Sequence, residues 1–444
     1  MKIFRSYDIR GVVGKDLNEK IAERIGLSFG TYLQGCEDVI VGMDMRVSSQ
    51  KLKKSFINGI TKTGCNVIDI GMVTTPMVAF SIAYLEKNAG VSVTASHNPA
   101  NWNGFKLKGK KAVNLTYDRE LKMVENIFIS KDFLKNKKHG IVIQKDIRKI
   151  YADKMYSSIK LNKKLKVVLD VGNGMGGIAE AIYRDIGCDV ITYFKEPDGT
   201  FPNHIPNPAE KDNMKFLQRA VVRHKADLGI AFDADCDRVG VVDNKGRIVR
   251  NDVLYEIFLQ SILSKKKGNV ICDVRTPSSV IDFVKNFSID PIISRAGSGY
   301  IMKQSIDEEA VFAGEMSGHF WFGDEWFHID DGIYSGAKII EILSNSRKSL
   351  AKIVDEMPKN YFMPSKRIKC PERKKEKVIA KLKTKFERTN EIIEIDGIKI
   401  VDKDYNVLVR PSRTEPQLEI VIESKKNNIA SIYKKFEKII KSLI

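Results

Sequence analysis

The stretch LGIAFDADCDRVGVV (228–242) contains an apolar run, an acidic loop and a second apolar run. Residues 228–232 predict a buried strand, and Asp233, Asp235 and Asp237 follow it at alternating positions. Three carboxylates on one tight loop cannot all stay ionised without a cation, and Mg²⁺ binds carboxylate oxygens together with a substrate phosphate. A solvated acidic turn would explain the polarity, but not its place at the carboxyl end of a strand, where α/β folds bind ligands. The stretch therefore predicts an α/β domain with a magnesium site.

Apolar, β-branched runs alternate with segments of helical spacing on both sides of this stretch. Helical spacing occurs at 22–33 and 48–61, and further strands are predicted at 39–41, 67–70, 91–93, 167–171, 239–242 and 270–272. Such alternation is typical of parallel sheets covered by helices. The similar runs VGMD (41–44), VLDVGNG (168–174) and VICDV (270–274) suggest three α/β units built alike.

The last part of the chain has a different pattern. After residue 364 a segment dense in Lys and Glu precedes predicted strands at 398–401, 405–409 and 418–422 and a helix at 429–443, an order typical of a small α+β domain. Breaks are predicted near 145–149, 244–246 and 358–364, where lysines, turn residues or prolines gather. We therefore predict four domains, with the boundaries 1–147, 148–246, 247–360 and 361–444.

Composition restricts the class of protein. The chain has 444 residues, 43% of them hydrophobic, and a net charge of +18, with 21 basic and 12 acidic residues in 361–444. The six cysteines form no CxxC pair, which is typical of reduced thiols. Residues 1–10 contain no apolar signal region, and the uncharged run near 70–85 is short for a membrane span. These features predict a cytoplasmic protein that does not enter a membrane.

Three further motifs combine groups that could bind phosphate or sugar. TASHNP (94–99) places a hydroxyl and an imidazole on a turn after a predicted strand. RPSRTEP (410–416) contains two arginines, whose guanidinium groups suit a phosphate. GEMSGH (314–319) contains a carboxylate between glycines. Each motif taken alone could also be an ordinary turn.

The run GNGMGG (172–177) loosely matches the dinucleotide-binding pattern GxGxxG and raises an oxidoreductase as an alternative, although the acidic residue required about twenty positions further on fits Asp189 or Glu196 poorly. No Walker A sequence is present, which argues against a P-loop kinase.

Eight motifs in one order resemble the α-D-phosphohexomutases, and most closely the phosphomannomutase/phosphoglucomutase branch. They are FRSYDIRG (4–11), TASHNP (94–99), NGFK (103–106), GTFPNHIPNP (199–208), FDADCDR (232–238), GEMSGH (314–319), DDGIYS (330–335) and RPSRTEP (410–416). The resemblance implies a heart-shaped, four-domain architecture, with three similar α/β domains and a smaller α+β C-terminal domain around a central cleft. It also implies reversible phosphoryl transfer between C1 and C6 of mannose or glucose phosphate, through a phosphoserine and a hexose 1,6-bisphosphate.

The resemblance also implies roles for individual residues. Ser96 would carry the phosphoryl group and would hold Mg²⁺ together with Asp233, Asp235 and Asp237. The other residues implied to be catalytic are Arg10, His97, Lys106, Arg238 and His319. Those implied to bind substrate are Tyr7, Arg295, Glu315, Ser317, Arg410, Ser412, Arg413 and Thr414.

The chain departs from the family pattern in three places. Ala234 and Cys236 stand in the acidic loop where glycine is usual, and Arg413 replaces a usual Gly or Asn. The segment 295–298 reads RAGS where KTGH is common, so the positive charge is kept and Ser298 replaces a histidine.

Other functions stay open from the residues alone. A phosphoglucosamine mutase would share the same motifs. A phosphatase could share the magnesium loop, and a nucleic-acid-binding protein would fit the pI of about 9.4 and the lysines of 366–385. The latter segment lacks interleaved aromatic residues, so we predict hexose phosphates as partners, no nucleic acid, and a monomer or weak homodimer.

Overall fold

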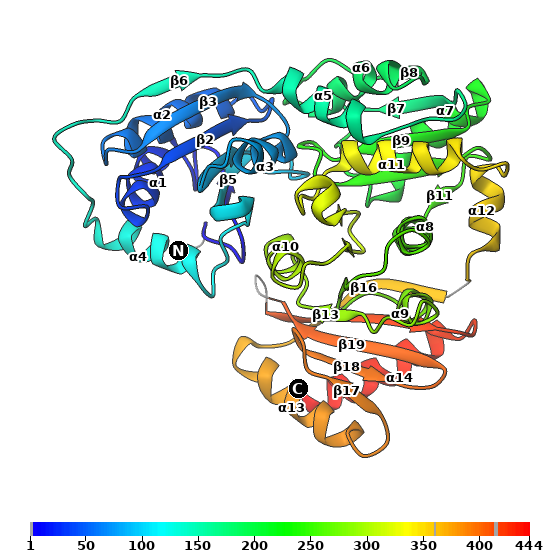
Figure 1. Ribbon diagram of the computed structural model, residues 1–444. Coiled ribbons are helices and arrows are strands. Elements are labelled where there is room, and N and C mark those ends of the chain that lie inside the picture. Colours follow the sequence, from blue (N-terminus) through cyan, green and yellow to red (C-terminus); the bar gives the residue numbers. More distant parts are fainter. Residues whose placement is uncertain (1–2, 359–360, 413–415) are drawn as a thin grey trace.

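The computed structural model describes residues 3–358, 361–412 and 416–444, and its four domains follow one another from the blue to the red end of the chain in Figure 1. Each domain is built on one sheet, of six, five, four and five strands in chain order. The four-domain architecture expected from the sequence is confirmed.

Domain I has a mixed six-stranded sheet in the order β1-β5-β4-β2-β3-β6. β2 pairs in parallel with both β3 and β4, so the residues after β2 and β4 emerge at the same edge. Its helices and strands are β1 (Ile9–Val12), α1 (Glu19–Tyr32), β2 (Asp38–Met43), α2 (Ser49–Thr61), β3 (Asn66–Met72), α3 (Thr75–Tyr84), β4 (Ala89–Val93), β5 (Trp102–Lys108), η1 (Lys110–Ala112), α4 (Glu120–Ser130) and β6 (Val142–Gln144). The strands and helices predicted in this region are confirmed.

Domain II has the sheet order β11-β10-β9-β7-β8, with β7 parallel to both β8 and β9. The acidic loop joins β9 to β10, as the sequence predicts. The elements are α5 (Arg148–Ser158), β7 (Lys166–Asp170), η2 (Met175–Gly177), α6 (Ile178–Asp185), β8 (Asp189–Tyr193), α7 (Lys211–His224), β9 (Leu228–Phe232), β10 (Val239–Asp243) and β11 (Ile248–Val249).

Domain III has the sheet order β13-β12-β14-β15, with β12 parallel to β13 and β14. The elements are α8 (Asn251–Leu263), β12 (Val270–Asp273), α9 (Ser278–Lys285), β13 (Ile292–Ser294), α10 (Ser298–Asp307), β14 (Phe312–Gly314), β15 (Phe320–Trp321), η3 (Gly323–Trp326), α11 (Gly332–Ser344) and α12 (Leu350–Glu356). Helix α11 contacts β9 and β10 of domain II, and Figure 1 draws it next to β9. One hydrophobic core therefore includes Phe80, Ile230 and Phe312 from three domains.

Domain IV has an antiparallel sheet in the order β16-β20-β19-β18-β17 with its own hydrophobic core. The elements are β16 (Tyr361–Lys369), η4 (Glu372–Lys374), α13 (Lys375–Phe386), β17 (Glu391–Ile393), β18 (Ile398–Val401), β19 (Tyr405–Pro411), β20 (Gln417–Ser424) and α14 (Ile429–Leu443). The predicted α+β character is confirmed. Contacts with domain III include Val274 against Leu408 and Val421.

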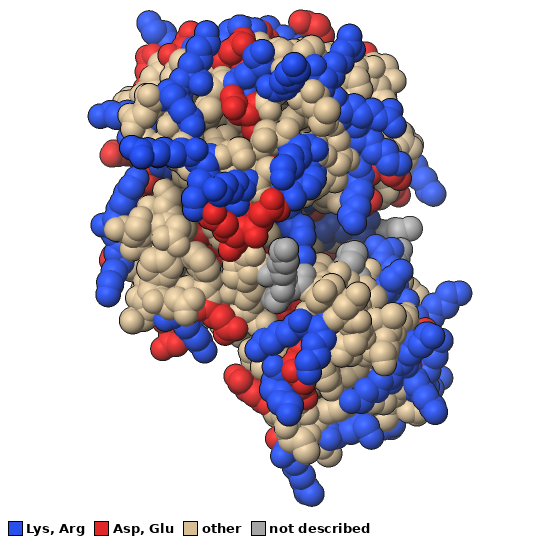
Figure 2. Space-filling model, turned by 90° about the vertical axis from the view of Figure 1, so that its right-hand side faces the viewer, with Lys and Arg blue, Asp and Glu red and all other residues tan. Residues whose placement is uncertain are grey.

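The surface charge is spread rather than concentrated on the face shown in Figure 2. Lys and Arg side chains cover both the upper part and domain IV below it, with acidic side chains among them. Among the helices of the described part of the chain, none is long and apolar enough to cross a membrane.

Candidate active site

Ser96 lies on the loop that leaves the carboxyl end of β4, and its backbone is held in an unusual conformation. Its φ is 51°, in the left-handed region, and its backbone N–H donates to Thr94 Oγ1 at 2.9 Å. The buried hydroxyl donates to Asp233 Oδ2 of domain II at 2.8 Å, and His97 Nδ1 is 3.2 Å from the same oxygen. Such strain in a non-glycine residue is typical of functional loops. The structure thus brings the predicted serine to the predicted acidic loop.

Arg46 anchors the serine loop, a role that the sequence reasoning missed. It follows β2, the parallel neighbour of β4, and its guanidinium donates at 2.5 to 3.0 Å to the carbonyl oxygens of Ser96, Asn98, Pro99 and Trp102. Asp44 accepts from its Nε at 3.1 Å, and both side chains are fully buried. The only sequence signal is an Asp-x-Arg directly after a strand.

The three aspartates of the acidic loop are buried and face one another. One oxygen from each of Asp233, Asp235 and Asp237 lies within 4.8 Å of the others. Among the described residues, Asp235 Oδ1 and Asp237 Oδ1 find no hydrogen-bond partner. Buried carboxylates with free oxygens fit a hard cation, which requires oxygen ligands. Ala234 and Cys236 stand between the aspartates and are both buried, and the backbone of Cys236 is in the left-handed region (φ 66°).

Lys106 of β5 bridges the cluster from domain I. Its ammonium donates to Asp235 Oδ2 at 2.7 Å and also to Asp237 Oδ2. Burial opposes the charge of Lys106, but these two carboxylates raise its pKa above the ordinary value. In turn, burial would raise the pKa of Asp235 and Asp237, whereas the Lys106 ammonium holds both values below the ordinary one. The pKa of Asp233 is raised, by burial and by the two neighbouring carboxylates.

The other residues predicted to be catalytic surround this cluster. Arg10 donates to Asn98 Oδ1 at 2.5 Å and to the Ala95 carbonyl oxygen at 3.0 Å. Arg238 Nε donates to His319 Nε2 at 2.9 Å and lies 4.0 Å from Asp233 and from Asp237. Burial, together with the charges of Arg238 and Arg10, lowers the pKa of His97 to about 2, so its imidazole is neutral.

A cavity of about 180 Å³ is lined by residues of domains I, III and IV. Its lining includes four of the residues predicted to bind substrate: Tyr7, Glu315, Arg410 and Ser412. Ser317 donates to Glu315 Oε2 at 2.6 Å, so it also belongs here. Arg410 pairs with Asp396 at 2.6 Å and with Glu419 at 2.9 Å. The structure thus gathers residues from distant motifs around one space.

Arg275 is a second residue that the sequence reasoning missed. It follows β12, the parallel neighbour of the strand that precedes Glu315, and its guanidinium bonds both Glu315 and Asp273. Although burial alone would raise the pKa of Glu315, Arg275 and His319 lower it to about 2, so the carboxylate is charged. Here too the sequence signal is an arginine directly after a predicted strand.

Three residues predicted to bind substrate are not placed in this cavity. Arg295 pairs with Asp118 of domain I at 2.7 Å and lines a separate cavity of about 910 Å³ between domains I and III. Arg413 and Thr414 lie outside the described residues. Ser298, which stands where a histidine is common, accepts a hydrogen bond from the Asn114 amide nitrogen at 3.1 Å. The Asn114 amide oxygen in turn accepts from the buried Lys108 ammonium at 2.7 Å.

The glycine run 172–177 packs closely against the acidic loop. Met175 N–H donates to the Ala234 carbonyl oxygen at 2.9 Å, so the run lies against the acidic loop. A Cβ on Gly174 would lie 3.0 Å from that oxygen, and one on Gly172 would lie 2.9 Å from Pro206. The run's glycines permit this close approach of backbones.

Comparisons with known proteins agree with this arrangement. Three domain families, described as phosphoglucomutase/phosphomannomutase alpha/beta/alpha domains I, II and III, match residues 1–135, 147–246 and 251–361. A phosphoglucomutase of Neisseria gonorrhoeae is 36% identical over 99% of this chain and 97% of its own length. A phosphomannomutase/phosphoglucomutase of Pseudomonas aeruginosa is 37% identical over 95% and 91%, and a probable phosphoglucosamine mutase of Pyrococcus abyssi is 35% identical over 100% and 98%.

A solved structure gives the same result for the fold. A phosphoglucomutase/phosphomannomutase family protein of Burkholderia thailandensis superimposes with a TM-score of 0.92 at 31% identity, covering 100% of this chain and 97% of that one. The matches span all four domains and the residues of the site described above. This chain belongs to the phosphoglucomutase/phosphomannomutase family of α-D-phosphohexomutases.

Proposed function

We propose that this phosphohexomutase, an isomerase, moves a phosphoryl group between C1 and C6 of mannose or glucose phosphate. Phosphorylated Ser96 would give its phosphoryl group to the free hydroxyl of the hexose monophosphate. The resulting 1,6-bisphosphate would turn in the cavity and return the other phosphoryl group to Ser96. The observation that supports this best is the strained, buried Ser96, whose hydroxyl donates to Asp233 within the acidic cluster at 2.8 Å.

The acidic cluster fits a magnesium ion. Asp233, Asp235, Asp237 and the Ser96 oxygen would hold it, since their oxygens lie close together and two of them lack partners in the described part of the chain. When bound, Mg²⁺ would supply positive charge against the phosphoryl oxygens. Arg10, Arg238 and Lys106 contribute fixed charge from the protein itself, and phosphoryl transfer depends mainly on such positioning and charge.

The smaller cavity would hold the sugar and the phosphate that is not transferred. Glu315 is charged and buried, so it would accept hydrogen bonds from sugar hydroxyls, with Ser317 and Arg275 fixing its position. Arg410 and Ser412 would bind the distal phosphate, and Arg413 and Thr414 complete the same motif in the sequence. A role for Arg295 in substrate binding stays a prediction, as do the domain boundaries, the monomeric or weakly dimeric state, the cytoplasmic location and the absence of nucleic acid.

The identity of the sugar can be tested with four 1-phosphates, those of glucose, mannose, glucosamine and galactose. We expect the kcat/KM values for glucose and mannose to lie within about a hundredfold of each other, because the sugars differ at one carbon. Galactose, inverted at C4, should react far more slowly, because Glu315 would keep a buried carboxylate oxygen without its donor. A clear preference for glucosamine 1-phosphate would favour the phosphoglucosamine mutase alternative instead.

Intact-mass spectrometry with the Ser96→Ala variant tests the phosphoryl carrier. The wild type should carry one phosphate after incubation with hexose 1,6-bisphosphate and Mg²⁺, and Ser96→Ala should carry none and have no turnover, because no hydroxyl remains to form the ester. Ser317→Ala is the matched control, since it removes a hydroxyl from the same region and should keep the phosphate. A phosphate that persists on Ser96→Ala contradicts the proposal.

A further inference from the structure

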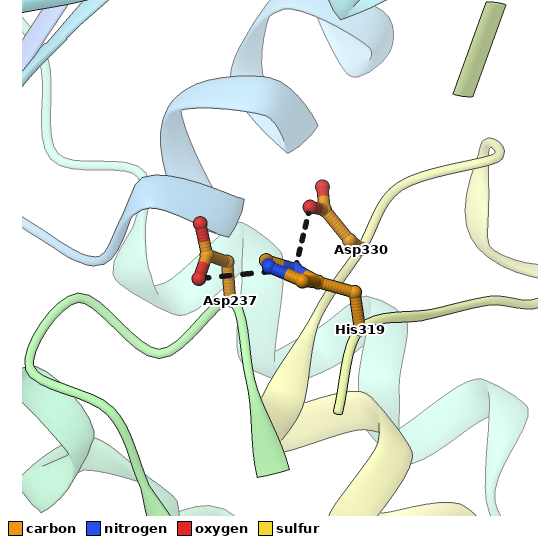
Figure 3. Close-up of side chains that lie close together, drawn as sticks. All are labelled: Asp237, His319 and Asp330. Atoms are coloured by element: carbon orange, nitrogen blue, oxygen red, sulfur yellow. Dashed lines mark ion pairs between the residues drawn. The ribbon is translucent and has the colours of Figure 1, made fainter. Parts of the chain in front are cut away.

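A cavity of about 910 Å³ lies apart from the active site, and we call it the second cavity. The active-site side chains Asp237, His319 and Asp330 lie together in Figure 3, and none of them lines this space. Among the described residues, none lines both this cavity and the smaller substrate cavity of about 180 Å³. Its lining comes from Tyr32 and residues within 109–120 of domain I, residues within 293–308 of domain III, and Ile395 of domain IV. Small-molecule sites have volumes of this order.

The lining of the second cavity is rich in basic side chains. Arg295 pairs with Asp118 at 2.7 Å, and Lys303 pairs with Asp307 at 2.5 Å. In the described part of the chain, the ammonium groups of Lys110 and Lys111 have no ion pair or hydrogen bond, so their charge is available to an anion. The charged residues of the lining are five basic ones, Lys110, Lys111, Arg119, Arg295 and Lys303, and three acidic ones, Glu120, Asp307 and Glu308.

A strained turn presents these two lysines. They belong to η1, which follows β5, and Lys111 and Ala112 both have a left-handed backbone, with φ of 57° and 61°. Ala112 is fully buried, and its N–H donates to the Gly109 carbonyl oxygen at 3.1 Å, whereas both lysine side chains are exposed. Two successive non-glycine residues in this region store strain, which is typical of functional loops.

Much of the remaining lining is apolar or aromatic. It includes the rings of Tyr32 and Tyr300 and the side chains of Val113, Leu115, Ile293 and Ile306. An inorganic phosphate would fill little of this volume and would leave these side chains in contact with water. Cations beside apolar and aromatic surface instead fit an organic molecule that carries phosphate.

The second cavity shares a wall with the substrate cavity. Residues 293–295 line the second cavity, and the next two residues, Ala296 and Gly297, line the substrate cavity. In domain IV, Ile395 lines the second cavity, whereas Asp396, the ion-pair partner of Arg410, lines the substrate cavity. The two spaces are therefore separated by adjacent residues of the same loops.

We propose that the second cavity binds a nucleotide-sized organic phosphate and that this ligand lowers the affinity of the substrate cavity. A phosphate beside Lys110 and Lys111 draws the Arg295 guanidinium away from Asp118, because arginine binds phosphate with two parallel hydrogen bonds. The displacement reaches Gly297, where an added Cβ would lie only 3.2 Å from the ring of Tyr7 in the substrate cavity. The effect on substrate rests on the proposed function, whereas the ligand site itself does not.

Calorimetric titration of the full-length, Mg²⁺-loaded protein with ADP tests the site, with Mg²⁺ in excess over the nucleotide. We expect one ADP to bind per chain even when glucose 1,6-bisphosphate saturates the active site, because the described linings of the two cavities share no residue. A Kd weaker than about 1 mM overturns the proposal. ADP binding that weakens without limit as bisphosphate is added also overturns it, because ADP would then occupy the active site.

Two double variants test the lysines. Lys110→Gln/Lys111→Gln removes two exposed charges from the second cavity and should weaken ADP binding at least about tenfold. Lys137→Gln/Lys138→Gln is the matched control: it removes two exposed charges of domain I outside this lining, and screening by salt should leave the Kd for ADP nearly unchanged. Both variants should keep the wild-type kcat without ADP, which shows that they fold. Equal weakening in both variants, or none in the first, overturns the proposal.

Inorganic pyrophosphate separates an organic ligand from an inorganic one. It carries the phosphates of ADP without the nucleoside and should bind at least about tenfold more weakly, because it leaves the apolar lining in contact with water. Equal binding of pyrophosphate and ADP would indicate a site for inorganic polyanions and would overturn the proposed ligand class.

The effect on the substrate cavity is measured as the Kd of glucose 1,6-bisphosphate. Saturating ADP should raise this Kd about fivefold or more, and the bisphosphate should raise the Kd of ADP by the same factor, because coupling between two sites is reciprocal. Lys110→Gln/Lys111→Gln should bind the bisphosphate as the wild type does and lose the effect of ADP. An unchanged Kd at saturating ADP overturns the coupling. If the protein binds no bisphosphate, the proposed function fails, whereas ADP binding at the two lysines is still measured.

Discussion

Replacing Arg46 should loosen the serine loop without touching the substrate. Its guanidinium donates to four carbonyl oxygens of residues 96–102 and to Asp44. Arg46→Met removes every one of these bonds and leaves the Asp44 carboxylate, which is 1% exposed, with its charge unpaired. Arg46→Lys keeps the positive charge. The compact lysine ammonium, however, lacks the planar, forked guanidinium with which arginine reaches four acceptors at once.

The magnitude follows from the burial of this pair. Removing one partner of a buried ion pair costs about 3–5 kcal/mol. With a urea dependence of about 2 kcal/mol per molar for the unfolding transition, Arg46→Met should lower the urea midpoint by about 2 M. Arg46→Lys should lower the midpoint less but still reduce kcat by about a hundredfold, because a shift of about 1 Å in a reacting group has that effect. KM should stay within about threefold, since the substrate contacts remain.

The assay pairs urea unfolding followed by tryptophan fluorescence with steady-state kinetics on glucose 1-phosphate. Arg24→Lys is the matched control, because Arg24 also donates to a backbone carbonyl oxygen of domain I, that of Phe128, on a helix rather than on the serine loop. It should change kcat little. A wild-type kcat in Arg46→Lys, together with a lowered urea midpoint, would show that Arg46 supports the fold and does not position Ser96.

Three further changes test the charges of the interior. Asp235→Asn should weaken Mg²⁺ binding at least about tenfold in calorimetry and abolish turnover, because a charged oxygen ligand is lost; unchanged binding would contradict the metal site. Burial raises the pKa of Glu256 to about 7, so its ionisation destabilises the fold as pH rises from about 4.5 to 7, and Glu256→Gln should be about 3 kcal/mol more stable at pH 8 and equal at pH 4 in urea unfolding. Equal unfolding free energies of the wild type and Glu256→Gln at pH 8 would show that the pKa of Glu256 is not raised. Asn114→Ala leaves the buried Lys108 ammonium without its acceptor and should lower the unfolding free energy by about 3 kcal/mol, which the double variant with Lys108→Met should largely restore. If the double variant does not regain the unfolding free energy, the unpaired Lys108 ammonium is not the cause of the destabilisation.

Much of the secondary structure could be predicted from the sequence, because it depends on local patterns. The apolar runs 228–232 and 270–272 are strands β9 and β12, and the helix predicted at 429–443 is α14. Runs of this kind bury themselves in any sheet, and helical spacing makes one face apolar in any surroundings. The acidic loop and the serine turn were equally visible, since their residue types stand next to one another in the chain.

The neighbours of each strand were not visible, and they decide which loops meet. Arg46 reaches Ser96 because β2 and β4 are parallel neighbours, and Arg275 reaches Glu315 because β12 and β14 are. Strand order depends on packing over the whole domain rather than on any local pattern.

Contacts between domains could not be predicted from the sequence at all. Ser96 and Asp233 are 137 positions apart, and so their hydrogen bond depends on how domains I and II pack. Arg295 shows the opposite case, in which an expected contact is not made. The motif around it predicted a place in the substrate site, but its side chain pairs with Asp118 of domain I. The sequence by itself determined the strands, the helices and the kinds of chemical group in the site. Only the tertiary structure decided which of these groups come together, because burial between domains is a property of the packed molecule and not of any segment.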